Sequence, residues 1–392
     1  MRAGPWMRLC GLGATGAVVL VVASGELGLT HRALVVVALP LLVAMAVGSW
    51  WAHRAVLRPT SAALVLYLAA LATWWAPRLH VALAGLAAAG TAVATAQLYR
   101  GRRPAPVAWR DYVALTKPRI MSLLLLTGAA GMFVGAQGLP VAGDFVAMMV
   151  GLALACGGAS AMNHVLDRDV DRSMKRTSSR PVAEGRVSPE LALEFGLALS
   201  ALSFVLLASA VNVLTACLAL VGNLFYVLVY TRWLKRSTPQ NIVIGGAAGA
   251  VPPLVGYAAA TGNLALPALF LFLIVFFWTP PHFWALALLI KRDYEAARIP
   301  MLPVVRGDRE TARQVLLYTV LLVALTLVPV LTGTFGWLYL GAAALLGAQF
   351  IRLALGLRRA TVPAQAGRLF HYSLAYLALL FVAMAIDPMV ML

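Results

Sequence analysis

Runs of apolar residues long enough to cross a membrane recur along almost the whole chain, and they constrain the fold more than any other feature. Hydrophobic residues make up 62% of the 392 residues, and charged residues only 11%. A segment of about 20 apolar residues spans the hydrocarbon core of a bilayer as a helix. The pattern therefore excludes a soluble globular protein and predicts an all-α, polytopic membrane helix bundle.

The apolar segments fall into two groups, separated by a basic, proline-containing linker at residues 100–106. Residues 1–108 are expected to form an appended N-terminal module with four spans, near 9–27, 33–52, 60–77 and 80–99. Residues 109–392 are expected to form a core of nine spans, near 120–138, 145–164, 190–209, 212–230, 241–260, 264–290, 314–333, 337–354 and 370–389. No chemical motif occurs in the first group, so its role stays open.

Lysine and arginine are distributed unevenly between the two ends of the predicted core spans. Every second loop is basic, whereas the loops near 139–144, 210, 261 and 334 contain neither residue. Cytoplasmic loops of membrane proteins are enriched in Lys and Arg. We therefore place the basic loops in the cytoplasm and attribute the net charge of +17 to topology and anionic lipid headgroups, not to nucleic acid. Without an Arg- and Ser-rich leader, the sequence favours a bacterial cytoplasmic (inner) membrane.

Acidic residues are scarce, 14 in all, yet three of them follow the second core span within five positions. If the end of that span is helical, Asn163, Asp167 and Asp171 lie at i, i+4 and i+8 and share one face, while Asp169 points elsewhere. Oxygen ligands alone suit Mg²⁺, which carboxylates commonly hold together with substrate phosphates. The acids could instead be salt-bridge partners of the neighbouring cations.

Basic side chains near these acids suit the phosphate oxygens that such a metal would bridge, which suggests a diphosphate as the ligand. Each of them could also be a simple topology signal. The candidates are Arg172, Lys175, Arg176, Arg180, Lys235, Arg236 and Lys291. Lys291 stands beside a further acid, Asp293, at the end of the sixth core span. Two acidic sites are therefore expected at the cytoplasmic edge.

One histidine, His282, lies inside the sixth core span beside Pro280, Pro281 and Trp284. An ionisable side chain at membrane depth is a functional candidate by default. The imidazole could bind iron or a carboxylate, or it could form a hydrogen bond between helices.

The motifs, in this order and spacing, resemble the UbiA superfamily of intramembrane prenyltransferases. The resemblance covers residues 110–392 and includes Asn-x-x-x-Asp-x-x-x-Asp after the second of nine spans and an acidic site after the sixth. Within the superfamily, three more segments are similar to the branch that farnesylates haem. They are Leu234-Lys-Arg-Ser-Thr, Pro281-His-Phe-Trp-Ala-Leu-Ala-Leu and Ile299-Pro-Met-Leu-Pro-Val-Val.

The resemblance implies a reaction. Asn163, Asp167 and Asp171 would hold Mg²⁺ on the diphosphate of farnesyl diphosphate, assisted by Asp293, while the basic residues neutralise the leaving group. A vinyl group of protohaem IX would capture the carbocation, and hydration would give haem O. His282 is implied to contact the haem, with His164 as a rival, and a downstream haem A synthase is a candidate partner.

The sequence departs from the family pattern in two segments. Leu288 and Leu289 stand where other branches carry further acids one turn before Asp293, which favours a single assisting acid. Arg298 stands where a Gly commonly precedes Ile-Pro-Met-Leu-Pro.

An aromatic prenyltransferase of the quinone or chlorophyll type would use the same diphosphate site and is the alternative enzyme. A transporter would need charged residues near mid-membrane on several spans, which this sequence lacks.

Overall fold

The computed structural model describes residues 107–390, residues 54–72 and several positions within 42–43 and 83–94. Helix α3 (Arg54–Ala72) contains a short apolar stretch, Thr60–Ala70. Most of the four spans predicted for the N-terminal module lie outside the described residues, so those spans and the boundary at residue 108 stay predictions.

Within the described part of the chain, nine helical segments are long and apolar enough to cross a membrane, and no strand occurs, so the predicted fold class is confirmed. In chain order they are α6 (Pro118–Ala136), α7 (Ala142–Leu166), α10 (Pro189–Ala210), α11 (Val213–Leu224) continued by η1 (Phe225–Leu234) and α12 (Lys235–Ser237), α13 (Asn241–Gly249) continued by α14 (Val251–Thr261), α15 (Leu266–Leu289), α17 (Leu302–Leu331), α18 (Trp337–Arg359) and α19 (Pro363–Val390). Four short helices complete the core, namely α5 (Trp109–Thr116), α8 (Arg168–Ser173), α9 (Pro181–Glu184) and α16 (Lys291–Ala296).

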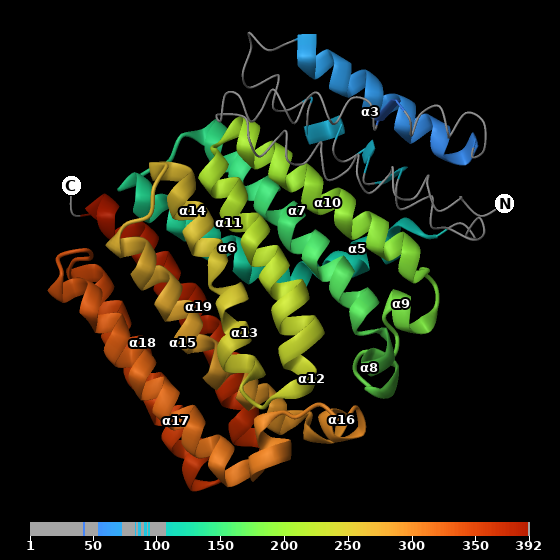
Figure 1. The fold of residues 1–392 in the computed structure, drawn as a ribbon. Coiled ribbons are helices and arrows are strands. Elements are labelled where there is room, and N and C mark those ends of the chain that lie inside the picture. Colours follow the sequence, from blue (N-terminus) through green and yellow to red (C-terminus); the bar gives the residue numbers. More distant parts are fainter. Residues whose placement is uncertain are drawn as a thin grey trace.

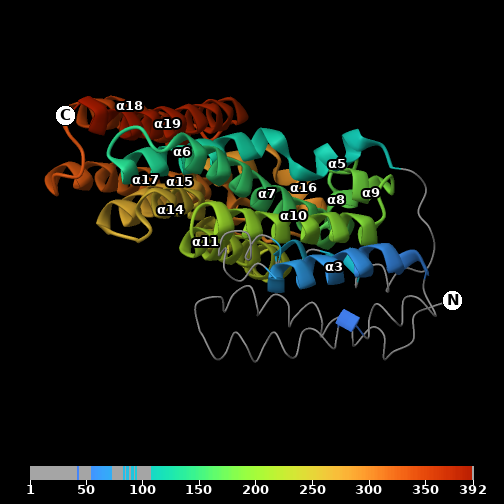
Figure 2. The same cartoon turned by 90° about the horizontal axis from the view of Figure 1, so that it is seen from above.

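The long helices form one bundle, and the short helices α8, α12 and α16 lie at the same end of it (Figure 1). Two apolar cores fill the bundle. One unites α15, α17, α18 and α19, and the other unites α6, α7, α10, α11 and α14. Seen from above, α18 and α19 lie on one side of the bundle and α3 on the other, beyond α10 (Figure 2).

A third apolar cluster lies where the acidic segments meet. It joins Val170 of α8, Ile242 of α13, Ala287 of α15 and Tyr294 of α16. Val170 and Tyr294 belong to the segments that follow the second and the sixth core spans, so the cluster packs the two acidic motifs against each other, together with residues from the start of α13 and the end of α15. The burial of apolar side chains thus brings together groups that are more than 100 residues apart in sequence.

Backbones approach closely between α6 and α14. A Cβ atom at Gly256 would lie 1.8 Å from the carbonyl oxygen of Gly128, and one at Gly131 would lie 2.3 Å from that of Pro253. Small residues allow this approach, which is a common way for membrane helices to associate. Because α6 and α14 contribute to both large cores, this contact couples the two halves of the bundle.

Some helices extend beyond the spans that hydropathy predicts. Helix α17 begins at Leu302, well before the predicted residue 314. The non-helical Gly307 (φ 78°, ψ 169°) separates its mostly apolar first turn from a polar stretch at residues 308–313, after which the long apolar part begins. The fourth span continues through η1 and α12 to Ser237. Hydropathy predicts the end of the apolar run, whereas backbone hydrogen bonding determines where the helix ends. The predicted span and the observed helix therefore differ in length.

Arg298 adopts a left-handed backbone conformation, with φ 54°. The N–H of Ile299 donates to the carbonyl of Tyr294 at 3.0 Å, and that of Arg298 to Glu295 at 3.1 Å. This pair of bonds is the Schellman arrangement that ends helix α16, and Gly is preferred at its left-handed position. Arg298, which stands where the family commonly has Gly, therefore places a Cβ atom in a conformation in which it is sterically unfavourable.

We predict that Arg298→Gly stabilises the protein by about 1 kcal/mol, because Gly adopts this conformation without the steric cost of a Cβ atom. Arg298→Ala keeps the Cβ atom and serves as the matched control, with no such gain expected. The midpoint of thermal unfolding in detergent micelles measures both. An equal gain in both variants would show that loss of the Arg298 charge, not relief of backbone strain, is responsible.

Candidate active site

Asn163, Asp167 and Asp171, here called the oxygen trio, lie at the junction of α7 and α8. Asp167 ends α7 and precedes α8, yet the hydrogen bonds of a helix continue through it. The N–H of Asp167 donates to Asn163 O at 2.9 Å, and that of Asp171 to Asp167 O at 2.7 Å. The backbone therefore keeps the i, i+4, i+8 register across the junction. All three residues are buried, with 1% to 3% of their surface exposed.

The trio leaves one oxygen atom without a partner. The Asn163 amide nitrogen donates to Asp167 Oδ2 at 2.7 Å and lies 3.1 Å from Thr231 Oγ1 of η1. Asp167 Oδ1, by contrast, is buried and accepts no hydrogen bond. An orphaned, buried carboxylate oxygen is unfavourable by itself and fits a bound cation. The described residues contain no group of three or more His, Cys, Asp or Glu side chains arranged for a metal, so an ion here would rely on the Asn163 amide.

Two lysines from separate segments contact the trio. Lys117, at the left-handed junction between α5 and α6, donates from Nζ to Asn163 Oδ1 at 2.6 Å. Lys235, the first residue of α12, donates to Asp167 Oδ2 at 2.6 Å. Burial, together with the nearby charge of Arg180, lowers the pKa of Lys117 to about 7. The sequence does not predict this contact, because Lys117 belongs to the basic residues that the charge pattern explains as topology signals.

Arg180 binds the third member of the trio. Its Nη1 lies 2.8 Å from Oδ1 and 2.9 Å from Oδ2 of Asp171. The loop that carries Arg180 is held at two points by other arginines. Arg172 Nε donates to the carbonyl of Ala183 at 2.9 Å, and Arg186 binds Asp111 of α5. Arg172 thus positions the loop, while Arg180 reaches the acids.

Asp169 and Arg236 form a separate pair at the rim. Both terminal nitrogens of Arg236 lie 2.7 Å from the Asp169 carboxylate, and one also donates to Leu166 O at 2.7 Å. These bonds hold the pKa of Asp169 at about 2. Arg236 also approaches Asp167 Oδ1, at 4.0 Å, which is beyond hydrogen-bonding range. As expected from its position in the register, Asp169 does not join the trio.

The second acidic motif contacts the first through the backbone. Asp293 Oδ2 accepts from the N–H of Arg176 at 3.3 Å, so the acid after the sixth span touches the loop after the second. Lys291 instead pairs with acids of its own half, 2.8 Å from Asp308 and 3.9 Å from Glu295. The side chains of Lys175 and Arg176 are exposed. The roles of these residues in binding diphosphate stay predictions.

His282 is held by stacking and by one hydrogen bond. Its ring stacks between Trp278 and Phe370, with centroids 4.4 and 4.9 Å away. Its Nδ1 lies 2.7 Å from Ser373 Oγ of α19, and that hydroxyl oxygen lies 2.7 Å from Phe370 O. Ser373 has one hydroxyl proton. If Phe370 O accepts it, Nδ1 of His282 donates to Ser373 and the lone pair of the ring is on Nε2; if Nδ1 accepts it, the ring proton is on Nε2.

His164 lies in α7, next to Asn163, and is almost fully buried, at 2% exposed. Neither of its ring nitrogens has a hydrogen-bond partner. The two candidate histidines thus differ: the ring of His282 is held by a hydrogen bond to Ser373, whereas no hydrogen bond holds that of His164.

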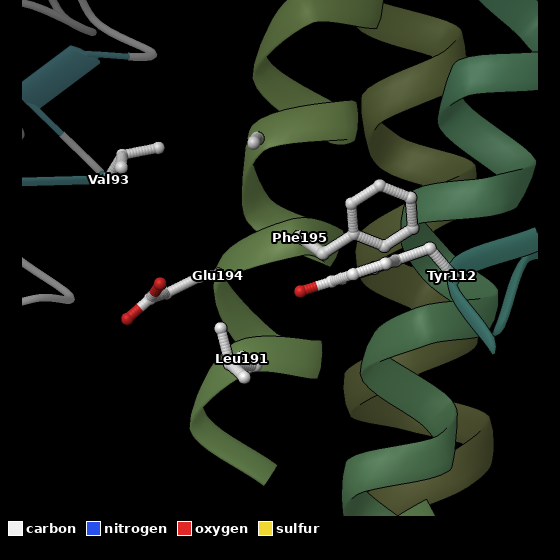
Figure 3. Close-up of a pocket in the computed structure, with 6 residues that line it drawn as sticks. Val93, Tyr112, Leu191, Glu194 and Phe195 are labelled. Atoms are coloured by element: carbon white, nitrogen blue, oxygen red, sulfur yellow. The ribbon is translucent and has the colours of Figure 1, made fainter. Parts of the chain in front are cut away.

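A pocket of about 330 Å³ lies at a different place, on the face of α10 (Figure 3). Its lining includes Val93, Tyr112, Glu194 and Phe195, and the Tyr112 and Phe195 rings meet edge to face at 5.0 Å. None of the predicted site residues lines it.

Comparison with known proteins identifies the family. The sequence profile of the UbiA prenyltransferase family matches residues 124–382. The chain is 56% identical over 280 residues to the protoheme IX farnesyltransferase of Symbiobacterium thermophilum, a match that covers 71% of this chain and 94% of that protein. It is 46% identical over 343 residues to the protoheme IX farnesyltransferase of a Roseiflexus species, covering 85% of this chain and 64% of that protein. The chain thus spans less than two thirds of this longer relative.

Solved structures with little sequence similarity share the fold. A digeranylgeranylglyceryl phosphate synthase matches with a TM-score of 0.61 at 19% identity, over 71% of this chain and 98% of that one. A UbiA homolog from Archaeoglobus fulgidus, bound to GPP and Mg²⁺, matches with a TM-score of 0.53 at 18% identity, over 70% of this chain and 99% of that one. Fold and sequence together define the class as a multi-pass membrane prenyltransferase. More narrowly, the chain belongs to the UbiA prenyltransferase family, which confirms the resemblance.

Proposed function

We propose that the chain transfers a farnesyl group from farnesyl diphosphate to a vinyl group of protohaem IX and that hydration then gives haem O. Relatives at 46% to 56% identity that carry the name protoheme IX farnesyltransferase support the substrates. The observation that carries the reaction type is the buried oxygen trio with Lys117, Lys235 and Arg180 on its three members. Such a site suits a reaction in which diphosphate is the leaving group, because the cations can neutralise its two negatively charged phosphoryl groups.

Asn163, Asp167 and Asp171 are the residues that would hold Mg²⁺, and the orphaned Asp167 Oδ1 is the atom that supports this assignment best. When bound there, the ion would supply positive charge to the diphosphate oxygens. The cationic side chains of Lys235 and Arg180 stabilise the charge that develops on the leaving group.

Cleavage of the allylic C–O bond leaves its electron pair on the diphosphate and an allylic cation on the farnesyl group. The vinyl π electrons of protohaem IX form the new C–C bond, and the resulting cation next to the porphyrin takes up water and releases a proton. The buried surroundings of the trio exclude bulk water from the first step, which protects the allylic cation from direct hydrolysis.

We propose His282, in preference to His164, as the residue that contacts the haem iron. A histidine that binds a metal almost always donates its other ring N–H to a fixed acceptor. His282 meets this condition in the tautomer in which Nδ1–H donates to Ser373 Oγ, because Nε2 then has a lone pair for the iron. His164 has no such acceptor.

We further propose that the end of the bundle with the trio faces the cytoplasm of a bacterium and that the membrane is the cytoplasmic one. The excess of Lys and Arg in the loops at this end supports that orientation. A role for residues 1–108 in contacting a downstream haem A synthase stays a proposal.

Asp167→Ala and Asp171→Ala are each expected to lower turnover by at least about 100-fold, because each removes an oxygen donor directed at the leaving group. Asp169→Ala is the matched control and should stay within about threefold, since an exposed ion pair contributes little. Purified protein with Mg²⁺, farnesyl diphosphate and haem is assayed for a product less polar than haem. Full turnover in both trio variants, or turnover indifferent to a chelator, would rule out the site.

A haem titration followed by absorbance distinguishes the two histidines. His282→Ala is expected to weaken haem binding by at least about tenfold and to change the Soret band, because the iron loses its axial ligand. His164→Ala should leave the Soret band unchanged. The opposite pattern would transfer the role to His164, and no change in either variant would exclude both.

A further inference from the structure

Every member of the oxygen trio carries a basic partner, and each partner comes from a different segment. Lys117 binds the Asn163 amide oxygen, Lys235 binds Asp167, and Arg180 binds both oxygens of Asp171. The distances, between 2.6 and 2.9 Å, are those of direct, charge-assisted hydrogen bonds. Among the oxygens of the trio side chains, only Asp167 Oδ1 lacks a partner.

These contacts use the lone pairs that a divalent ion would need. Two carboxylates already face the charges of Lys235 and Arg180 and the amine of Lys117, so the group has no net negative charge to attract a divalent ion. A divalent ion that entered alone would meet electrostatic repulsion and would have to displace the lysines and the arginine. If these side chains were displaced within the buried site and found no new partners, their unpaired charges would be energetically unfavourable.

A diphosphate removes this difficulty because it offers the displaced cations a new partner. Lys235 and Arg180 are partly accessible, with 14% and 20% of their side chains exposed, whereas the acids they bind are at 1% and 2%. In each of these two pairs, the cation is thus the more accessible partner and the one that an arriving diphosphate would reach first.

We propose that Lys117, Lys235 and Arg180 are exchangeable counter-cations, which occupy the oxygen trio when it is empty and turn to the diphosphate when a divalent ion replaces them. Metal and diphosphate consequently bind interdependently, and the trio has low affinity for a divalent ion alone. The proposal rests on the proposed function, because it takes the trio to be the metal site of the prenyl transfer.

The test measures metal binding in the absence of any diphosphate. Mn²⁺, which also prefers oxygen ligands, is titrated into the full chain in detergent, and free Mn²⁺ is followed by its paramagnetic resonance signal. Lys117→Met and Lys235→Met are each expected to raise the affinity for Mn²⁺ at least about tenfold over the unsubstituted protein, because each removes a competing cation. Lys291→Met, which removes a cation paired with Asp308, is the matched control and should change the affinity less than twofold.

Unchanged or weaker Mn²⁺ binding in both lysine variants would overturn the proposal, provided that thermal unfolding shows both to be folded. If one variant fails to fold, the other decides the outcome, and Arg180→Met gives a third, independent comparison.

Adding Asp167→Asn to each protein separates this proposal from the proposed function. Loss of Mn²⁺ binding with Asp167→Asn, together with equal affinities in the unsubstituted and lysine variants, would reject the exchange but keep the metal site. Mn²⁺ binding that survives Asp167→Asn in all proteins would reject the metal site itself, and the exchange with it.

Discussion

The burial of two carboxylates, Asp167 and Asp171, at the end of a membrane span is the constraint on which the rest of the structure depends. Buried charges are costly unless they are paired and hydrogen-bonded. Here their partners come from the loop before α9 and from the start of α12, so both segments must meet at the end of α7. A further buried acid, Asp387 near the C-terminal end of α19, is stabilised differently. Its carboxylate accepts hydrogen bonds from the N–H groups of Gly336 and Tyr339 at the start of α18.

This difference between the two acidic sites bears on function. Backbone N–H groups cannot move away from Asp387 without unwinding a helix, so that site is structural. Lysine and arginine side chains can rotate away from the trio while the helices stay in place. A site that is neutralised by mobile cations can accept another cation, and it retains positive charge nearby for an anionic substrate. The same contacts therefore stabilise the fold and prepare the chemistry of diphosphate departure.

The sequence predicts the nine core spans because each contains a long apolar run, and it predicts the register of Asn163, Asp167 and Asp171 because i+4 spacing is local. It could not predict that Lys117 reaches Asn163, since the two are 46 positions apart and the lysine reads as a topology signal. The change from α-helix to the π-helix η1, which presents Thr231 to the trio, is likewise not predicted from the sequence, in which this stretch continues an apolar span. The pairing of Lys291 with Asp308 depends on the early start of α17, which hydropathy does not reveal.

The most direct measurement is a crystal structure of the protein soaked with Mn²⁺ and a non-reactive thio analogue of farnesyl diphosphate, with data collected for anomalous scattering by manganese. A manganese peak in contact with Asp167 and Asp171, with the diphosphate between the metal and Lys235, is the predicted result. A bound analogue whose diphosphate lies away from the trio, or manganese bound only beside Asp293 and Asp308, would contradict it.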